Sequence, residues 1–175
     1  MYNAQSRKAM IPMSKLEELI AELCPDGVEF ETIENVFITK SAPRKLNRKD
    51  YQESGVYPVI DQGQNFIVGY TDDKTAVIPK DEYVIFGEHT RFIKYVDFQF
   101  AQGADGVKIL KPANKKLSAK YLYYAFSNLE IPSRGYNRHW VVAKDLIIPV
   151  PPLPVQRKIV RILDNFTELT AELTA

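Results

Sequence analysis

The stretch IIPVPPLPVQRKIVRILDNFTELTAELTA, residues 147–175, decides how the rest of the chain is organised. It opens with an apolar run that stops at prolines. Pro154 suits the first turn of a helix, because its fixed φ fits there and its missing N–H is not needed. Beyond it, apolar residues recur at alternating spacings of four and three, which places them on one helical face as a heptad seam: Val155, Ile159, Ile162, Phe166, Leu169 and Leu173.

The face opposite this seam is charged, with Arg157, Lys158, Arg161, Asp164, Glu168 and Glu172. At the usual rise per residue such a helix is roughly 33 Å long, which is more than a small domain needs to complete its fold. We therefore interpret residues 153–175 as a dimerisation or partner helix that forms a coiled coil with a second copy or with another protein. The alternative is a last helix that folds back onto its own domain.

Composition limits the classes of function. The 175 residues suffice for one domain and an appendage, and ten tyrosines and nine phenylalanines can fill a core. Because the formal net charge is only +1, a nucleic-acid surface would require local clustering of cations. One cysteine and two histidines are too few for a disulfide framework or a multi-cysteine zinc site. Neither a signal peptide nor a membrane span is visible, so we expect a cytoplasmic protein.

The first part of the chain predicts a short helix. Residues 1–12 are polar and unpatterned, and we interpret them as a leader or an expression remnant. Ser14 and Glu17 then form a capping-box pattern, in which each side chain satisfies a free amide at the start of a helix. Apolar residues at helical spacing extend this helix to about Leu23, and Pro25-Asp26-Gly27 ends it.

The middle of the chain predicts short β-strands. Between turn signals lie runs rich in Val, Ile, Tyr and Phe, which suit a pleated surface: VYPVI, FIVGY, TAVIP, YVIFG, FIKYVDFQF and VKIL. Their regular spacing predicts a curled or barrel-like β core, and the runs that are apolar on both faces require helices or a second sheet to cover them. Ser118 then caps a predicted helix that Pro132 ends, and the polar loop 133–139 follows. Together these patterns predict an α+β fold, a curled β-rich domain with short helices over residues 13–152 followed by the long helix.

The sequence offers no convincing catalytic set. The only Pro-Pro pair, Pro151-Pro152, lacks the polar head and aromatic ring of an amino-methyltransferase box, and the eight glycines form no phosphate-binding loop. Asp72-Asp73-Lys74 is the nearest match to a metal-dependent nuclease, but Asp is common in turns of this kind. We therefore expect a protein that is not an enzyme.

Binding to DNA is better supported, because three polar loops contain the side chains that contact phosphates and base edges. They are 62–65, with two glutamines and an asparagine, 88–91 at the end of the YVIFG run, and 134–139; residues 102–106 are a weaker fourth. The basic segment 40–49 adds cations without an acid, although it can equally be a solvated surface loop. Tyr136 and Trp140 can stack on bases, but aromatic residues beside a strand are more often part of a core.

The candidate DNA-binding residues follow from these loops. We expect contacts to phosphates from Lys40, Arg44, Lys45 and Arg48. We expect contacts to bases from Gln62, Gln64, Asn65, Arg91, Asn137 and Arg138. The remaining candidates on the same loops are His89, Thr90, Arg134, Tyr136 and His139.

Several segments, taken in order, resemble the specificity (S) subunit of type I restriction–modification systems. They are Val56–Ile60, Gly69–Thr71, Ile85–Gly87, Gly103–Gly106, Gly135–His139 and, as the most specific of them, Pro151–Val160 with the sequence PPLPVQRKIV. The resemblance covers about Met13 to Ala175. It is to one target-recognition domain and the beginning of one long helix.

This resemblance implies a non-catalytic subunit that reads one half of a bipartite target in double-stranded DNA. Partner methyltransferase (M) and restriction (R) subunits would hold S-adenosylmethionine, Mg and ATP, and this chain would need no cofactor or metal. A natural half-subunit would form a homodimer and read a palindromic split site. No membrane partner is implied. Two other hypotheses stay open from the sequence, a protein-interaction adaptor and a lone metal-dependent nuclease that uses Asp72 and Asp73.

Overall fold

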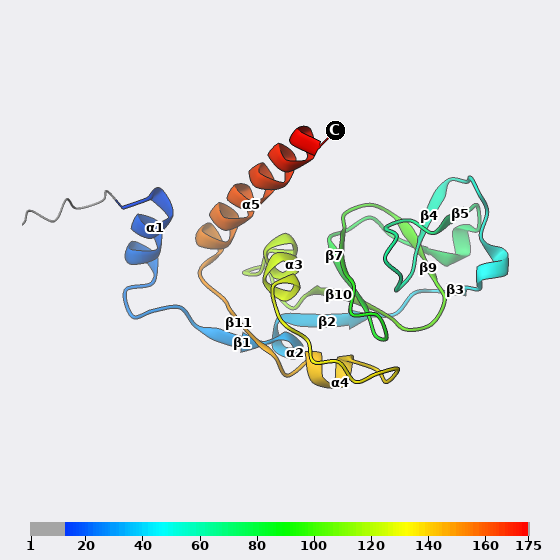
Figure 1. The fold of residues 1–175 in the computed structure, drawn as a ribbon, viewed down its shortest axis with the longest axis horizontal. Coiled ribbons are helices and arrows are strands. Elements are labelled where there is room, and N and C mark those ends of the chain that lie inside the picture. Colours follow the sequence, from blue (N-terminus) through cyan, green and yellow to red (C-terminus); the bar gives the residue numbers. More distant parts are fainter. Residues whose placement is uncertain (1–12, 175) are drawn as a thin grey trace, which may run out of the picture.

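A computed structural model describes residues 13–174, so the expected leader at 1–12 lies outside the described residues (Figure 1). The predicted α+β fold is confirmed, with β-sheets in the middle of the chain and a long last helix. The elements are α1 (Lys15–Leu23), β1 (Phe30–Thr32), α2 (Ile33–Val36), β2 (Phe37–Lys40), β3 (Lys45–Leu46), η1 (Arg48–Asp50), β4 (Tyr57–Ile60), β5 (Gly69–Thr71), η2 (Lys74–Ala76), β6 (Val77–Ile78), β7 (Tyr83–Gly87), β8 (Ile93–Val96), β9 (Phe100–Gly103), β10 (Val107–Pro112), α3 (Ala119–Ser127), α4 (Trp140–Ala143), β11 (Ile147–Pro149) and α5 (Leu153–Thr174).

The β core consists of two sheets, and the second packs against β7, β8 and β10 of the first. The first is a 4-stranded antiparallel sheet in the order β2-β10-β7-β8, and the second is a 5-stranded mixed sheet in which β9 pairs with β3, β4 and β6. All of β7 is buried. Successive side chains of a strand point to opposite faces, so Val84 and Phe86 enter a core with α3, whereas Tyr83 and Ile85 enter a core with the second sheet. The predicted cover on both faces is therefore supplied by helices on one side and strands on the other.

Some boundaries differ from those the sequence predicts. The FIKYVDFQF run divides into β8 and β9, because the chain turns at 97–99. Of FIVGY only Gly69 and Tyr70 are in a strand, and the preceding side chains Phe66 and Ile67 are exposed. The segment that begins at Trp140 forms the short helix α4. It packs on Phe86 through the indole ring, with the ring centroids 5.8 Å apart.

A two-stranded antiparallel ribbon closes the β domain. It pairs Phe30 with Pro149 and Thr32 with Ile147, which brings the beginning and the end of the domain together. As a result α1 and α5 leave from the same place and are in contact with each other. Figure 1 shows both helices on one side of the molecule, with the second sheet on the opposite side. The predicted capping box of α1 is confirmed, with Ser14 Oγ accepting from the amide of Glu17.

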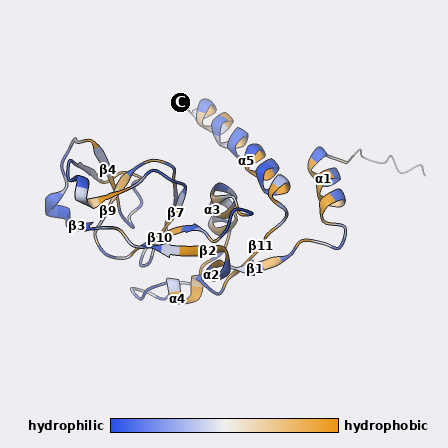
Figure 2. Ribbon diagram, turned by 180° about the vertical axis from the view of Figure 1, so that it is seen from behind, coloured by the Kyte–Doolittle hydropathy of each residue, from blue (hydrophilic) through white to orange (hydrophobic). Residues whose placement is uncertain are grey.

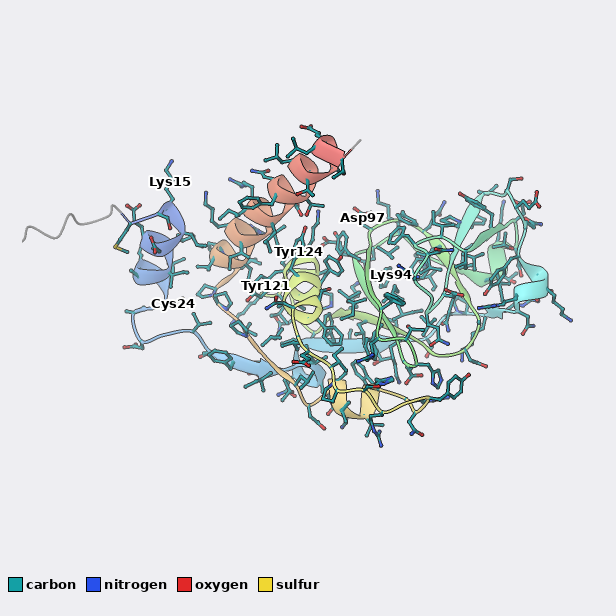
Figure 3. The ribbon with its side chains drawn as sticks, in the orientation of Figure 1. Lys15, Cys24, Lys94, Asp97, Tyr121 and Tyr124 are labelled. Atoms are coloured by element: carbon teal, nitrogen blue, oxygen red, sulfur yellow. The ribbon has the colours of Figure 1, made fainter. Side chains whose placement is uncertain are left out.

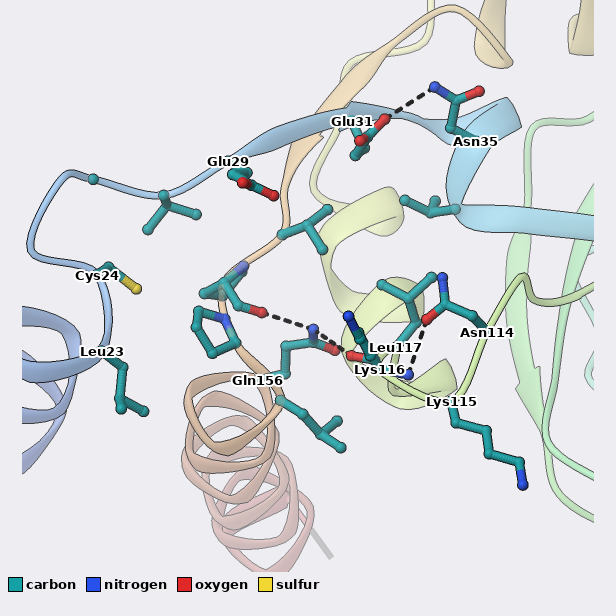
Figure 4. Close-up of a pocket in the computed structure, with 17 residues that line it drawn as sticks. Leu23, Cys24, Glu29, Glu31, Asn35, Asn114, Lys115, Lys116, Leu117 and Gln156 are labelled. Atoms are coloured by element: carbon teal, nitrogen blue, oxygen red, sulfur yellow. Dashed lines mark hydrogen bonds between the residues drawn. The ribbon is translucent and has the colours of Figure 1, made fainter.

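Helix α5 begins at Leu153, next to Pro154, as the sequence predicts. Its fourth residue, Gln156, is buried and joins three parts of the chain (Figure 4). Gln156 Oε1 accepts from the amide of Ser118 at 2.9 Å, and Nε2 donates to the carbonyls of Lys116 at 3.1 Å and Pro151 at 2.8 Å. The start of α5 is thereby tied to the start of α3, beside a cavity of about 740 Å³ that is lined by residues from α1 to α5.

The apolar seam of α5 has two different environments. Val155 is fully buried, and Ile159 packs against the core that contains α3. Phe166, Leu169 and Leu173 are 64%, 53% and 79% exposed, and Figure 2 shows hydrophobic and hydrophilic residues side by side on this half of the helix. The first part of α5 thus folds back onto its own domain, whereas the second part leaves its apolar residues uncovered.

The point where α5 leaves the domain is fixed by Asp164. Its carboxylate accepts from Lys120 Nζ at 2.8 Å and from Tyr124 Oη at 2.7 Å, both on α3. Figure 3 labels Tyr124 on this helix. Burial alone would raise the pKa of Asp164, but the hydrogen bonds from Lys120 and Tyr124 outweigh it and lower the pKa below its usual value.

No helix of residues 13–174 combines the length and the apolar character needed to cross a membrane.

Replacing Gln156 with Ala should destabilise the chain by about 2 to 4 kcal/mol, because it leaves buried amide and carbonyl groups without partners. Urea unfolding followed by circular dichroism measures the change. Arg157→Ala, at the exposed neighbouring position, is the control and should change the free energy of unfolding by less than about 0.5 kcal/mol. An unfolding midpoint of the Gln156 variant equal to that of the wild type would contradict the role of this side chain.

The contribution of Asp164 should depend on pH. Since its pKa is lower in the folded state, its stabilisation is present above the unfolded pKa and is lost as pH falls through the folded pKa. The wild type should therefore be more stable than Asp164→Asn at neutral pH, and the difference should shrink as the solution is acidified below about pH 4. A difference that stays constant from pH 7 to pH 3 would rule out this contribution.

Candidate nucleic-acid interface

Four polar loops meet at one edge of the β core. We name them loop A (61–66), loop B (88–92), loop C (104–106) and loop D (133–139). Strands β4 and β9 are parallel neighbours, so loops A and C, which follow them, emerge at the same edge. Gly87, the last residue of β7, pairs with Val107 of β10, which brings loop B beside loop C, and the amide of Glu88 donates to the carbonyl of Gly106 at 2.7 Å. The sequence predicted the loops, and the strand pairing brings them together.

Gln62 of loop A makes hydrogen bonds to both loop B and loop C. Its Oε1 accepts from the amide of His89 at 3.1 Å, and its Nε2 donates to the carbonyl of Asp105 at 3.1 Å. Its own carbonyl accepts from the hydroxyl of Thr90. The sequence predicted that Gln62 contacts a base; the structure shows its amide group bonded to loops B and C, and the base contact itself stays a prediction.

A buried lysine holds the backbone of loop A through two hydrogen bonds. Lys94, on β8, donates through Nζ to the carbonyls of Asp61 at 2.8 Å and Asn65 at 2.7 Å. Burial lowers its pKa, and the charge of Asp61 opposes that shift. The sequence analysis did not identify Lys94 as a functional residue, although a single lysine within an apolar strand run was a signal that it has a specific partner.

Both histidines of the sequence hold loop D. The amide of Arg134 donates to His139 Nε2 at 3.0 Å, so Nε2 is unprotonated and Nδ1 carries the hydrogen that it donates to the carbonyl of Glu88 at 2.9 Å. His139 is 1% exposed, so the prediction that it contacts DNA does not fit the structure. On loop B, His89 Nδ1 bonds the carbonyl of Tyr136, and the two rings stack with their centroids 5.0 Å apart.

The candidate side chains of loop D are exposed, apart from His139. Tyr136 is 88% exposed, and Arg134, Asn137 and Arg138 are exposed with it. Gly135 has a φ of 62°, the left-handed conformation that a glycine allows at the tip of this loop. Of the two aromatic candidates, Tyr136 is therefore exposed, whereas Trp140 packs against the core.

Acidic groups near these loops are partly neutralised. Glu88, which is buried, lies 3.7 Å from Arg138 Nη1 and 3.9 Å from Lys108 Nζ. Asp105 pairs with Lys45 at 3.0 Å, and the hydrogen bond from Lys45 lowers its pKa. The buried carboxylate of Glu88 thus lies near Arg138 and Lys108, and the exposed carboxylate of Asp105 is paired with Lys45.

The other predicted residues lie around the edge or away from it. Arg91 donates to the carbonyl of Ile131, although the residue itself is exposed. Gln64 lines a groove toward α3 and α5, and Asn65 is exposed beyond it. Arg48 and Lys40 are exposed, Arg48 beside Asp61 and Lys40 near Asp81 on another part of the β core.

The carboxylates considered for a nuclease have structural roles. Asp72 accepts from the amide of Val56 at 2.9 Å, and Asp73 caps η2 by accepting from Thr75. Asp73 also pairs with Arg44 at 2.6 Å, which holds that predicted phosphate ligand at the surface. No group of three or more His, Cys, Asp or Glu side chains in residues 13–174 is arranged to hold a metal ion.

Comparison with known protein families shows to which family this chain belongs. The family described as type I restriction modification DNA specificity domain matches residues 25–175. This chain belongs to that family. It is 37% identical over 182 residues to the specificity subunit of the type I restriction enzyme EcoR124I/EcoR124II of Escherichia coli, a match that covers 95% of this chain and 44% of that protein. The resemblance identified from the sequence is thus confirmed.

Solved structures of the family share the fold. The S subunit of the type I restriction-modification system from M. genitalium has a TM-score of 0.60 at 22% identity, over 91% of this chain and 44% of that chain. The HsdS subunit from Thermoanaerobacter tengcongensis has a TM-score of 0.54 at 19% identity, over 90% and 44%. The chain therefore spans less than half of the length of these relatives.

Proposed function

We propose that this chain recognises the base sequence of one half of a bipartite DNA target and carries no catalytic activity of its own. The observation that supports this most strongly is the convergence of loops A to D on one edge of the β core, with loop D exposing two arginines, a tyrosine and an asparagine. Arginine and asparagine side chains form paired hydrogen bonds with guanine and adenine edges, and tyrosine stacks on bases. Membership of the DNA specificity domain family supports the same function.

Within this proposal the residues have two kinds of role. Arg134, Tyr136, Asn137 and Arg138 of loop D, together with Arg91 and Asn65, face the bases or the nearest phosphates. Arg44, Lys45 and Arg48 hold flanking phosphates, because their side chains are exposed at the surface and phosphate contacts need charge more than exact geometry. Gln62, Thr90 and His139 position the loops.

We further propose that the exposed half of α5 binds a helix of a partner. An apolar stripe on a protruding helix is stabilised when a second helix covers it, and the spacing of Phe166, Leu169 and Leu173 suits a coiled coil. The partner is a second copy of this chain or another subunit of a restriction–modification assembly. Methyl transfer, cleavage and their S-adenosylmethionine, Mg and ATP would belong to M and R subunits.

Selection from a pool of randomised duplexes tests the function. The chain should enrich a short sequence, and log affinity for the enriched duplex should fall linearly with log salt at about −0.9 per phosphate contacted. Arg138→Ala should weaken binding by about 1 to 3 kcal/mol if the guanidinium contacts a guanine, with discrimination relaxed at one base pair only. Absence of any enriched sequence, with no dependence of affinity on salt, would contradict DNA recognition and favour an adaptor that binds proteins.

Replacing Leu169 with Asp tests the proposed role of α5. Because this side chain is exposed in the isolated chain, the variant should fold with wild-type stability, yet lose helix-mediated association through an unpaired charge in an apolar contact. Sedimentation of the chain alone and with its co-expressed subunits measures this, with Glu168→Asp on the charged face as the control. Unchanged association in both mixtures would show that this half of α5 is not an interface.

A further inference from the structure

We propose that Gln62 is a positioning residue for sequence recognition: its side chain sets the placement of loops B and C, and through them of the exposed residues of loop D. The inference rests on the proposed DNA-recognition function. It differs from the expectation that Gln62 itself contacts a base, because its effect on the bases would be indirect.

The orientation of the Gln62 amide is fixed by its two partners. Oε1 faces an N–H donor on His89 and Nε2 faces a carbonyl acceptor on Asp105. A flipped amide would bring donor against donor and acceptor against acceptor, so only one orientation satisfies both. One planar group of fixed size thus sets the separation between the backbones of loops B and C.

Two glycines provide the space for this arrangement. A Cβ on Gly106 would lie 2.6 Å from Gln62 Nε2, and a Cβ on Gly87 would lie closest to Thr90 Oγ1 and 2.8 Å from the carbonyl oxygen of Gln62. Gly106 also has a φ of 83°, which disfavours any other residue. The end of β7 and the residue before β10 therefore leave room for Gln62 and for Thr90, whose hydroxyl donates to the Gln62 carbonyl.

The contacts continue from Gln62 to the exposed surface. His89, whose amide Gln62 holds, stacks on Tyr136 and bonds its carbonyl, so the position of loop B determines the position of loop D. Asp105, whose carbonyl Gln62 holds, pairs with Lys45. A displacement of Gln62 would therefore move Tyr136, the proposed stacking residue, through loop B, and Lys45, a proposed phosphate ligand, through loop C.

This arrangement predicts a selective effect on DNA binding. The cations of loop D remain at the surface when Gln62 is changed, so phosphate contacts and the salt dependence of binding should persist. Discrimination requires fixed geometry of the loops, so the affinity ratio between an enriched duplex and its scrambled counterpart should fall. A side chain that only stabilised the fold would lower the active fraction without changing this ratio.

Two variants test the proposal in the full chain. Gln62→Ala removes both side-chain bonds and should lower the affinity ratio by about tenfold or more. Gln62→Glu keeps an acceptor for the His89 amide but cannot donate to Asp105, so its ratio should lie between those of Gln62→Ala and the wild type. Gln99→Ala changes an exposed glutamine before β9 that makes no side-chain hydrogen bond among the described residues, and it should keep the wild-type ratio.

Amide hydrogen exchange of the free chain gives a readout without DNA. The His89 amide should exchange faster in Gln62→Ala and stay protected in Gln62→Glu. A folded Gln62→Ala variant with the wild-type affinity ratio would overturn the proposal, as would wild-type protection of His89. If Gln62→Ala does not fold, a folded Gln62→Glu variant decides in the same way, and its wild-type ratio would overturn the proposal. If the wild type itself does not discriminate between duplexes, the proposed function fails instead, and the exchange rates still show whether Gln62 holds loop B.

Discussion

Burial of β7 on both of its faces is the constraint on which the structure depends. A strand with an apolar residue at almost every position cannot face water on either side, so it must lie between two layers. Phe86 meets the helices and Ile85 meets the second sheet, and the neighbouring strand β10 contributes to the same two cores through Leu110 and Ile109. The end of β7 is thereby held in place, and that end leads directly into loop B.

Strand direction then separates the two parts of the molecule that the proposed function needs. The ends of β4, β7 and β9 place loops A, B and C at one edge of the core, and His139 attaches loop D to them. The ribbon of β1 and β11 places α1 and the start of α5 on the side of the domain opposite the second sheet (Figure 1). Farther along α5, Thr167 and Glu168 line a groove with Gln64 and Phe66 of loop A. That groove is lined by polar residues of α5, so in our account DNA on loop D and a partner helix on Phe166, Leu169 and Leu173 can be bound at once.

Local signals in the sequence predicted local structure well. The serines that cap α1 and α3, the proline at the start of α5 and the YVIFG strand are each determined by nearby residues, and the structure confirms them. The division of FIKYVDFQF and the helix at Trp140 depend on tertiary packing, which a pattern of residue types does not contain. The seam of α5 was recognised as one apolar face, but its change from buried to exposed depends on how far α5 packs on α3, where Asp164 contacts Lys120 and Tyr124.

In the candidate site, too, the sequence predicted what nearby residues determine and missed what distant partners determine. The sequence identified the loops, because polar residues with glycine between strands are a local signal. It could not distinguish Gln62 from Gln64, or His139 from His89, since each pair shares residue type and loop. The difference lies in partners that are distant in sequence: Gln62 reaches Asp105, and His139 reaches Glu88. Lys94 and Gln156 were not identified as functional residues for the same reason, because their roles are set by carbonyl and amide groups that the sequence does not place.

Hydrogen–deuterium exchange of the chain, with and without a duplex that it has enriched, tests most directly whether DNA binds the loops and not α5. Our account predicts that DNA slows exchange in loops A, B and D and leaves residues 165–174 of α5 unchanged. Protection of α5 by DNA with loops B and D unaffected would contradict the assignment of these two surfaces.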